Sequence, residues 1–135
     1  MKKVVVKALV ENLDTVLELL NSELELCGFP EEHIPVINVA VEEIFVNICD
    51  YAFEADAGDI LFAMSANAEE AVFQFEDRGK PFNPLHVPEP DLDKPISERD
   101  IGGLGIHFVR QIMDELEYRY EAETNVLIMK KKGVI

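Results

Sequence analysis

The segment DILFAMSANAEEAVFQFEDRGKPF, residues 59–82, predicts the centre of a β-sheet followed by a polar turn. Asp59–Ala66 and Ala71–Glu76 are rich in aliphatic and aromatic residues, whereas Asn67–Glu70 between them is mostly polar. In the second run phenylalanine alternates with other residues, which places both rings on one face of a strand. The segment therefore predicts two strands joined by a hairpin, with Asp77 at the end of the second strand.

Apolar periodicity on either side of this hairpin predicts three helices and three further strands. In chain order they are a strand Lys3–Val10, a helix from Asn12 or Asp14 to Gly28, a helix opening at Pro30, a helix Gly105–Leu116, and strands Glu117–Ala122 and Asn125–Lys132. This order fits an α+β fold, a two-layer α/β sandwich with a mostly antiparallel mixed sheet and helices on one face. Alternating βαβ units are absent, which argues against a Rossmann or P-loop fold, and the absence of a GxxxxGK[ST] motif excludes an ordinary P-loop site.

Length and charge restrict the class of protein. A chain of 135 residues with 48% hydrophobic content is expected to form one globular domain. Its 12 basic and 27 acidic residues give a net charge of −15, which argues against direct nucleic-acid binding. An ATP site remains compatible with that charge, because backbone N–H groups and magnesium can hold phosphates on an acidic protein. A basic protein partner also fits, although acidic surfaces more often serve only solubility.

The cysteines and histidines show no metal-binding spacing. Cys27 and Cys49 form no CxxC motif, and His33, His86 and His107 are scattered, so a structural zinc site is not expected. The N-terminal sequence lacks the apolar run of a signal peptide. No apolar run approaches the roughly 20 residues of a membrane span. We therefore expect a cytoplasmic protein with reduced thiols and no membrane partner.

Glu43, Asn47 and Tyr51 share one face of the second predicted helix, because they stand four residues apart. A carboxylate and an amide oxygen one turn apart suit Mg²⁺, which takes few protein ligands and keeps its waters and phosphates. Glu43 could then activate a hydroxyl or water for attack on a γ-phosphate. The alternative for this pattern alone is an ordinary solvated helix face.

Asp77 and Gly79 mark a possible base-binding turn. An aspartate at the end of a strand can accept a hydrogen bond from an exocyclic amine such as that of adenine, and Gly79 permits close backbone approach. The alternative is a plain turn, since Asp and Gly are favoured turn residues.

Gly102, Gly103 and Gly105 precede a strong helical pattern. Glycines there leave the first N–H groups of the helix accessible to an anion, which the helix dipole also attracts. The alternative is a hinge, and a lid over a nucleotide would need one. The preceding segment, residues 78–100, contains five of the seven prolines, which is typical of a functional or mobile loop.

Together, Glu43-Ile-Phe-Val-Asn47, Asp77-Arg-Gly-Lys-Pro-Phe82 and Gly103-Leu-Gly-Ile106 resemble the N box and the two glycine boxes of the GHKL ATPase superfamily. More closely, the chain resembles the small anti-sigma factor serine/threonine kinases of bacterial stress and sporulation pathways, over nearly its whole length. This resemblance implies a Bergerat-type fold, with residues 1–135 as a single GHKL-like domain. It also implies that the domain binds ATP and Mg²⁺ beneath a lid over residues 78–104.

The resemblance implies a role for each matching residue. Glu43 would be the general base, Asn47 the Mg²⁺ ligand, Asp77 the acceptor for the adenine amine, and Gly79 would lie beneath the base. Backbone groups of four residues would meet the phosphates: Gly103, Leu104, Gly105 and Ile106.

This chain departs from the family at three points. Asn125 falls where relatives often carry Thr near the adenine, so its role is open. Tyr51 replaces a common His. Pro81-Phe82 stands in place of a second glycine pair, a variant that the smaller family tolerates.

The predicted function is an ATP-dependent protein serine/threonine kinase that also acts as an anti-sigma factor. Its implied partners are a sigma factor and a small Ser-containing anti-anti-sigma protein. Members of the family frequently dimerise, so the resemblance allows a homodimer, while the sequence leaves the oligomeric state open. An alternative is a nucleotide-gated interaction module without kinase activity. A histidine-kinase ATPase domain is a weaker alternative, since the sequence has no dimerising helix bearing a phosphoacceptor histidine.

Overall fold

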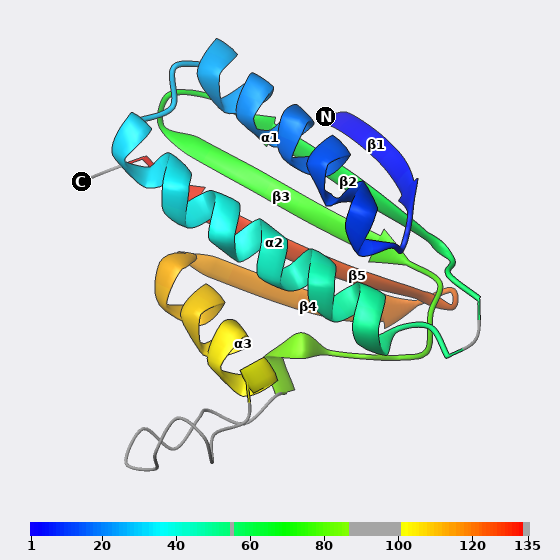
Figure 1. Cartoon of the computed structure of the whole chain (residues 1–135). Helices are drawn as coiled ribbons and strands as arrows, with labels where there is room; N and C mark the ends of the chain where they lie inside the picture. Colours follow the sequence, from blue (N-terminus) through cyan, green and yellow to red (C-terminus); the bar gives the residue numbers. More distant parts are fainter. Residues whose placement is uncertain (55, 87–100, 134–135) are drawn as a thin grey trace.

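One five-stranded sheet forms the base of the molecule (Figure 1). The computed structural model describes residues 1–54, 56–86 and 101–133, and for residues 101–104 it describes the backbone alone. The strands are β1 (Lys2–Lys7), β2 (Asp59–Ala66), β3 (Glu70–Asp77), β4 (Glu115–Glu121) and β5 (Thr124–Lys132). They lie in the order β1-β2-β3-β5-β4, and every neighbouring pair is antiparallel.

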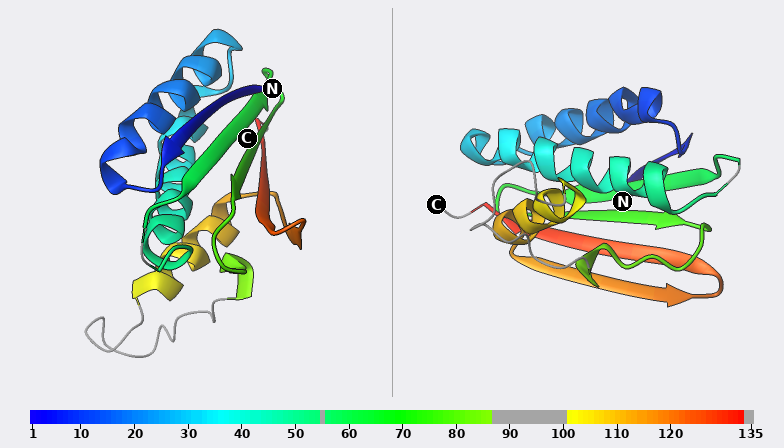
Figure 2. Two further views of the ribbon diagram at one scale, coloured as in Figure 1. Left: turned by 90° about the vertical axis from the view of Figure 1, so that its right-hand side faces the viewer. Right: turned by 60° about the horizontal axis from the view of Figure 1, so that its bottom comes forward.

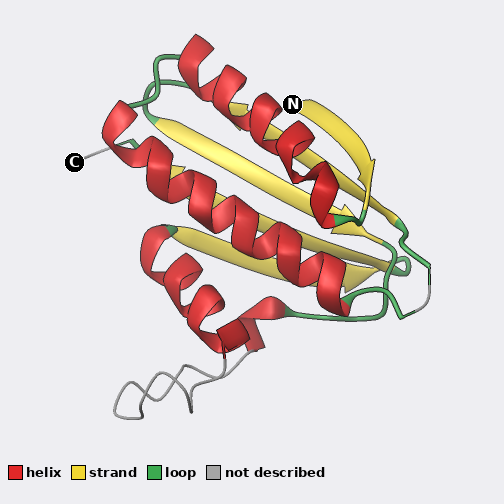
Figure 3. Cartoon of the chain, viewed as in Figure 1, coloured by secondary structure: helices red, strands yellow, loops and turns green. Residues whose placement is uncertain are grey.

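Three helices cover one face of this sheet (Figure 2). They are α1 (Leu13–Leu26), α2 (Ile34–Tyr51) and α3 (Ile101–Ile112), and the colouring of Figure 3 separates this helical layer from the strands. Short 3₁₀ turns occupy Val10–Asn12, Glu31–His33 and Pro84–His86. The predicted α+β sandwich is confirmed. Among the described residues, no helix has the length and apolar character needed to cross a bilayer.

The core lies between the two layers, and α2 runs through its middle. The apolar residues at helical spacing on α2 are buried from Ile37 to Ile48, as are the ring of Phe62 on β2 and the alternating rings on β3. Side chains with at most 1% exposure include Ile37, Val41 and Ile44 from α2 and Phe62, Phe73 and Phe75 from the sheet. Burying one such side chain contributes roughly 1.5–3 kcal/mol, so this contact fixes α2 against the sheet.

The ends of the first elements have local causes. Gly28 adopts a left-handed φ of 74° just after α1, the conformation that terminates a helix at low steric cost. Asn12 precedes α1 but does not cap it, because its side-chain amide donates to the carbonyl of Lys7 over 3.0 Å. β1 ends at Lys7 rather than at the predicted Val10, since Ala8 N–H bonds to Gly58 and the chain then turns.

The predicted bounds of the third helix are wrong at both ends. α3 begins at Ile101, so the predicted glycines lie inside its first turns rather than before it. It ends at Ile112 rather than Leu116, because Asp114 N–H bonds to the Lys130 carbonyl and Glu115 pairs with Lys130 in the sheet. Sheet pairing thus overrides the helical spacing of the last apolar residues. Most of the predicted lid, residues 87–100, lies outside the described residues.

Candidate functional site

Glu43 and Asn47 lie one turn apart on α2, as predicted. The side-chain nitrogen of buried Asn47 donates to the carbonyl oxygen of Glu43 over 2.6 Å. Among the described residues, this leaves the Asn47 amide oxygen as the atom able to accept a further partner. Burial, and secondarily the neighbouring Glu42 carboxylate, raise the pKa of Glu43. One face of α2 therefore presents an amide oxygen beside a carboxylate of raised proton affinity.

Asp77 ends β3 and is held by two donors. Its Oδ1 accepts the Gly79 N–H over 2.9 Å and the Asn125 side-chain nitrogen over 3.0 Å. The side chain is only 6% exposed, and this burial raises the pKa of Asp77 against the opposing effect of both hydrogen bonds. Both described donors bond to Oδ1, so Oδ2 is the oxygen that can accept from a ligand.

Gly79 brings the turn after β3 against the end of α2. A Cβ on Gly79 would collide with the carbonyl oxygen of Ala52 and lie 2.7 Å from its Cβ. Lys80 N–H donates to the same carbonyl over 2.9 Å. Glycine is therefore required here for packing within the chain, because any side chain would separate the turn from α2.

Asn125 joins β5 to this turn through both ends of its amide. Its nitrogen donates to Asp77 and, over 2.9 Å, to the carbonyl of Lys80. Its oxygen accepts the Phe82 N–H over 3.1 Å and the hydroxyl of Tyr118. Sequence reasoning placed Asn125 near the base-binding turn, and the structure makes it the centre of that turn's hydrogen bonds.

Tyr118 is a residue that sequence reasoning missed. It lies on β4, outside all three boxes, and no local motif marks it; only the order of strands in the sheet brings its hydroxyl to Asn125. Burial raises the pKa of Tyr118, the Phe82 backbone opposes that rise, and nearby Asp77 adds to it. The cavity among these side chains is only about 10 Å³, the lower limit for a single water.

The glycine segment of α3 meets α2 at Glu43. A Cβ built on Gly105 would collide with Oε2 of Glu43 and stand 3.0 Å from its Cδ. Ile106 follows as a buried core residue with 1% exposure. Gly103 and Leu104 lie in the first turn of α3, where only the backbone is described. The segment thus approaches the predicted carboxylate through Gly105.

The predicted residues form two connected groups. Glu43, Asn47 and Gly105 lie together where α2 meets α3, and Asp77, Gly79 and Asn125 bond to one another beyond the end of β3. The end of α2 lies against the second group, since Gly79 packs on Ala52 and the centroid of the Tyr51 ring lies 5.6 Å from that of Phe82. The chain thus brings together four segments that are far apart in sequence.

The chemistry of these atoms suits a nucleotide with magnesium. Asp77 offers an acceptor oxygen, Asn47 an amide oxygen and Glu43 a carboxylate, while the first backbone N–H groups of α3 have no partner within the helix. No cluster of three or more His, Cys, Asp or Glu side chains suited to a metal occurs in the described part of the chain.

Relatives with assigned names match most of the chain. The serine-protein kinase RsbW of Bacillus mycoides is 24% identical over 107 residues, which cover 76% of this chain and 67% of the relative. The protein of the same name from Bacillus cereus strain B4264 is 26% identical over the same coverage.

Two solved structures share the fold. The RsbU and RsbW domains of a Mycobacterium tuberculosis protein match 97% of this chain with a TM-score of 0.61 and 14% identity, and the match covers 32% of that longer chain. The Acinetobacter baumannii histidine kinase AdeS matches all of this chain and 70% of its own, with a TM-score of 0.52 and 13% identity.

A family model also covers almost the entire sequence. The model for the histidine kinase-like ATPase domain matches residues 6–131, a span that runs from β1 to β5 and contains every predicted site residue. This chain therefore belongs to the family of histidine kinase-like ATPase domains.

Proposed function

We propose that this protein binds Mg-ATP and transfers the γ-phosphoryl group to a serine or threonine of a small partner protein, as a cytoplasmic anti-sigma factor. The observation that carries the proposal is that the Glu43 carboxylate and the Asn47 amide lie one turn apart on α2, with the amide oriented by its hydrogen bond to the backbone carbonyl of Glu43. The family match supports a nucleotide site of this kind, and relatives named serine-protein kinase support the reaction.

The base of the nucleotide lies at the end of β3 in this proposal. Oδ2 of Asp77 accepts a hydrogen bond from the adenine amine, since Oδ1 is occupied by Gly79 and Asn125. Gly79 keeps the turn close to α2 and lies beneath the base. Asn125 holds Asp77 from β5 and ties the following turn to the sheet.

The phosphates lie between α2 and the start of α3. The first four N–H groups of a helix have no intrahelical partner, and because α3 begins at Ile101 the last of these belongs to Gly103, which makes it available to phosphate oxygens. The N–H groups of Leu104, Gly105 and Ile106 fall beyond these four, and they would reach a phosphate only if the first turn unwound. Asn47 would hold Mg²⁺ through its amide oxygen, and the ion, when bound, would neutralise charge on the phosphates.

Glu43 acts on the attacking hydroxyl. Its carboxylate orients the serine or threonine hydroxyl of the partner and accepts the proton as the oxygen attacks the γ-phosphorus. The bond from that phosphorus to the β–γ bridging oxygen breaks at the same step, and ADP leaves. The raised pKa of Glu43 suits this role, because a stronger base takes a hydroxyl proton more readily. Positioning and charge stabilisation account for most of the catalysis of such a transfer.

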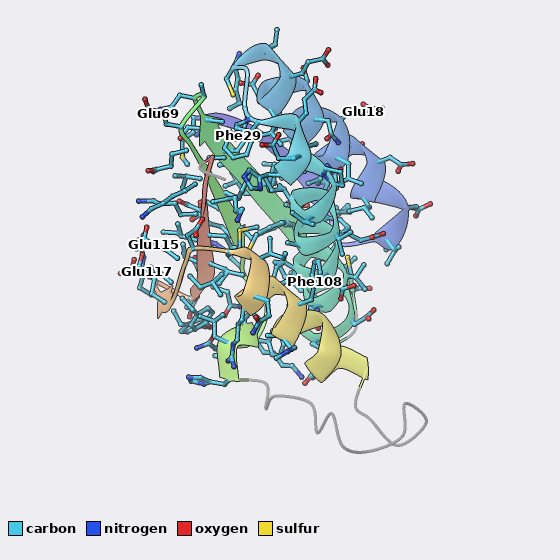
Figure 4. The ribbon with its side chains drawn as sticks, turned by 90° about the vertical axis from the view of Figure 1, so that its left-hand side faces the viewer. Glu18, Phe29, Glu69, Phe108, Glu115 and Glu117 are labelled. Atoms are coloured by element: carbon cyan, nitrogen blue, oxygen red, sulfur yellow. The ribbon has the colours of Figure 1, made fainter. Side chains whose placement is uncertain are left out.

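The surface charge supports a basic protein partner. Acidic side chains project from the helical layer at Glu18 and from the edge strand β4 at Glu115 and Glu117 (Figure 4). The net charge of −15 would accelerate association with a basic surface and oppose contact with nucleic acid. A sigma factor and a small Ser-containing antagonist remain the proposed partners, and the protein is proposed to act as a homodimer.

The proposal is tested by phosphate transfer from γ-labelled ATP into proteins of the host lysate. Wild type should label one discrete protein, and Glu43→Gln should abolish the band while retaining Mg-ATP affinity within about twofold, measured by calorimetry. Glu42→Gln is the matched control, because Glu42 is the exposed neighbour on the same helix and should retain the band.

Three other outcomes would count against the proposal. Tight ATP binding without a labelled band would favour a nucleotide-gated interaction module without kinase activity. A band that survives Glu43→Gln would remove Glu43 from catalysis. Loss of ATP binding in Glu43→Gln would show that Glu43 has a structural role in the site rather than a catalytic one.

A further inference from the structure

The Asn125 amide has a single possible orientation. Its oxygen faces the Phe82 backbone N–H at 3.1 Å, and its nitrogen faces the Lys80 carbonyl at 2.9 Å. Rotating the amide by half a turn would place N–H against N–H and oxygen against oxygen. These two backbone groups therefore direct the Asn125 nitrogen to Asp77 Oδ1, 3.0 Å away.

Tyr118 completes the set of partners of this amide. Its hydroxyl bonds to the Asn125 oxygen from β4, so the oxygen is held from the turn on one side and from the sheet on the other. The surrounding cavity of about 10 Å³ leaves these groups in direct contact rather than joined through solvent. The orientation of Asp77 thus depends on Asn125, and that of Asn125 partly on Tyr118.

The titratable groups near Tyr118 do not ionise its hydroxyl, so the hydrogen bond to the Asn125 oxygen is made by a neutral side chain. Asp77 and Tyr120 are the groups that act on the Tyr118 hydroxyl, and both disfavour its ionised form. Tyr118 therefore remains a neutral phenol, which can donate to the Asn125 oxygen at neutral pH.

We propose that Tyr118 is a positioning residue for recognition of the nucleotide base, acting through Asn125 on Asp77. The inference rests on the proposed function, in which Asp77 accepts the exocyclic amine of adenine. Without the Tyr118 hydroxyl the Asn125 oxygen keeps only the Phe82 N–H as a donor, so the amide retains its orientation but is held less rigidly. The Asp77 carboxylate that it contacts is then also held less rigidly. The consequence is weaker discrimination between a 6-amino purine and a 6-oxo purine, because only the former donates to Asp77.

The test compares Mg-ATP with Mg-ITP by calorimetry on wild type, Tyr118→Phe and Tyr120→Phe. Inosine carries an oxygen where adenine carries the amine, so the ratio of the two dissociation constants reports on Asp77. We expect wild type to prefer ATP and Tyr118→Phe to lower that preference about fivefold, the effect of one weakened hydrogen bond. Tyr120→Phe removes a hydroxyl two residues along the same strand and should leave the ratio unchanged.

A double-variant comparison tests the route through Asn125. In an Asn125→Ala background, Tyr118→Phe should cause no further loss of discrimination; additive losses would overturn the inference. An unchanged ratio in Tyr118→Phe would overturn it as well, as would equal weakening of ATP and ITP, which would indicate a general effect on folding. If wild type binds ATP and ITP alike, or neither, the base assignment in the proposed function fails first.

Discussion

Gly105 of α3 lies directly against the carboxylate of Glu43 on α2. A Cβ on Gly105 would stand 3.0 Å from Glu43 Cδ and closer still to Oε2. Because Gly105 has no side chain, the backbone of α3 can pack directly against the Glu43 carboxylate on α2. Gly105 resembles a phosphate-binding residue in sequence, and its missing side chain also leaves the space that the Glu43 carboxylate occupies.

Gly105→Ala is expected to displace the Glu43 carboxylate. Phosphoryl transfer should fall about 100-fold, the effect typical of a catalytic group misplaced by about 1 Å, while Mg-ATP affinity changes little. Alanine is about 1 kcal/mol better than glycine in a helix interior, which offsets part of the steric cost, so the thermal midpoint should not drop greatly. Transfer assays paired with calorimetry check this, and an unimpaired transfer rate would show that Glu43 adapts to the methyl group.

Asp77→Asn is expected to weaken ATP binding without destabilising the fold. The amide keeps an oxygen for Gly79 and Asn125 but presents an N–H₂ group in place of Oδ2, so it cannot accept the adenine amine. We expect ATP affinity to fall about 10- to 100-fold. Calorimetry measures this, and retention of full affinity would remove Asp77 from base recognition.

The same substitution should stabilise the fold at neutral pH. Burial raises the pKa of Asp77 in the folded state above its ordinary 3.8, so the stability that protonated Asp77 contributes is lost as the pH rises through that raised value. The Asp77→Asn side chain cannot ionise, so the variant should not lose this stability as the pH rises. In denaturant titrations its free energy of unfolding should exceed that of wild type at pH 7, and the difference should shrink towards pH 3. A difference that does not depend on pH would contradict burial of an ionised Asp77 as the cause.

Asn47→Ala is expected to weaken Mg-ATP binding about 10- to 100-fold, because the amide oxygen is the proposed ligand of the ion. Asn38→Ala is the matched control. Asn38 lies earlier on the same helix and exchanges two hydrogen bonds with Asn21 of α1, each 2.8 Å long. Asn38→Ala should lose stability and keep the Mg-ATP affinity of wild type. If Asn47→Ala also binds Mg-ATP as tightly as wild type, Asn47 is not the ligand of the ion.

The turn between β4 and β5 has a strained backbone that a substitution could relieve. Ala122 and Glu123 both adopt left-handed φ angles, of 52° and 59°, which side chains other than Asn, Asp and Gly adopt at a cost. Replacing them with the Asn-Gly pair that favours this turn should raise the free energy of unfolding by about 1 kcal/mol. Denaturant titration measures the gain, and none is expected for Ala68→Gly, which creates Asn-Gly at residues 67–68, where neither residue has a positive φ.

Local pattern was sufficient to predict most elements of the fold and the residues of the boxes. The apolar stripe of α2 and the alternating rings of β3 each predicted the correct element, because a periodic pattern reflects burial on one face. The end of α3 was not predictable in this way, since the Lys130 carbonyl that captures Asp114 comes from a distant strand. Tyr118 was missed for the same reason.

The contacts within the site depended even more on tertiary structure. The sequence indicated Glu43 and Gly105 separately, but only the packing of α3 on α2 places one against the other. Asn125 was expected near the base, whereas its bonds to Lys80 and Phe82 follow from the path of the turn across β5. Residue types thus identified the chemistry, and long-range pairing determined the geometry.

The most direct measurement is calorimetric titration of the wild-type protein with ATP, in the presence of Mg²⁺ and then of EDTA. We expect one site per chain whose affinity falls at least about tenfold without magnesium, because Asn47 binds the nucleotide through the ion. Absence of ATP binding in the presence of Mg²⁺ would contradict the nucleotide site itself. Binding that is unchanged by EDTA would contradict the magnesium role of Asn47.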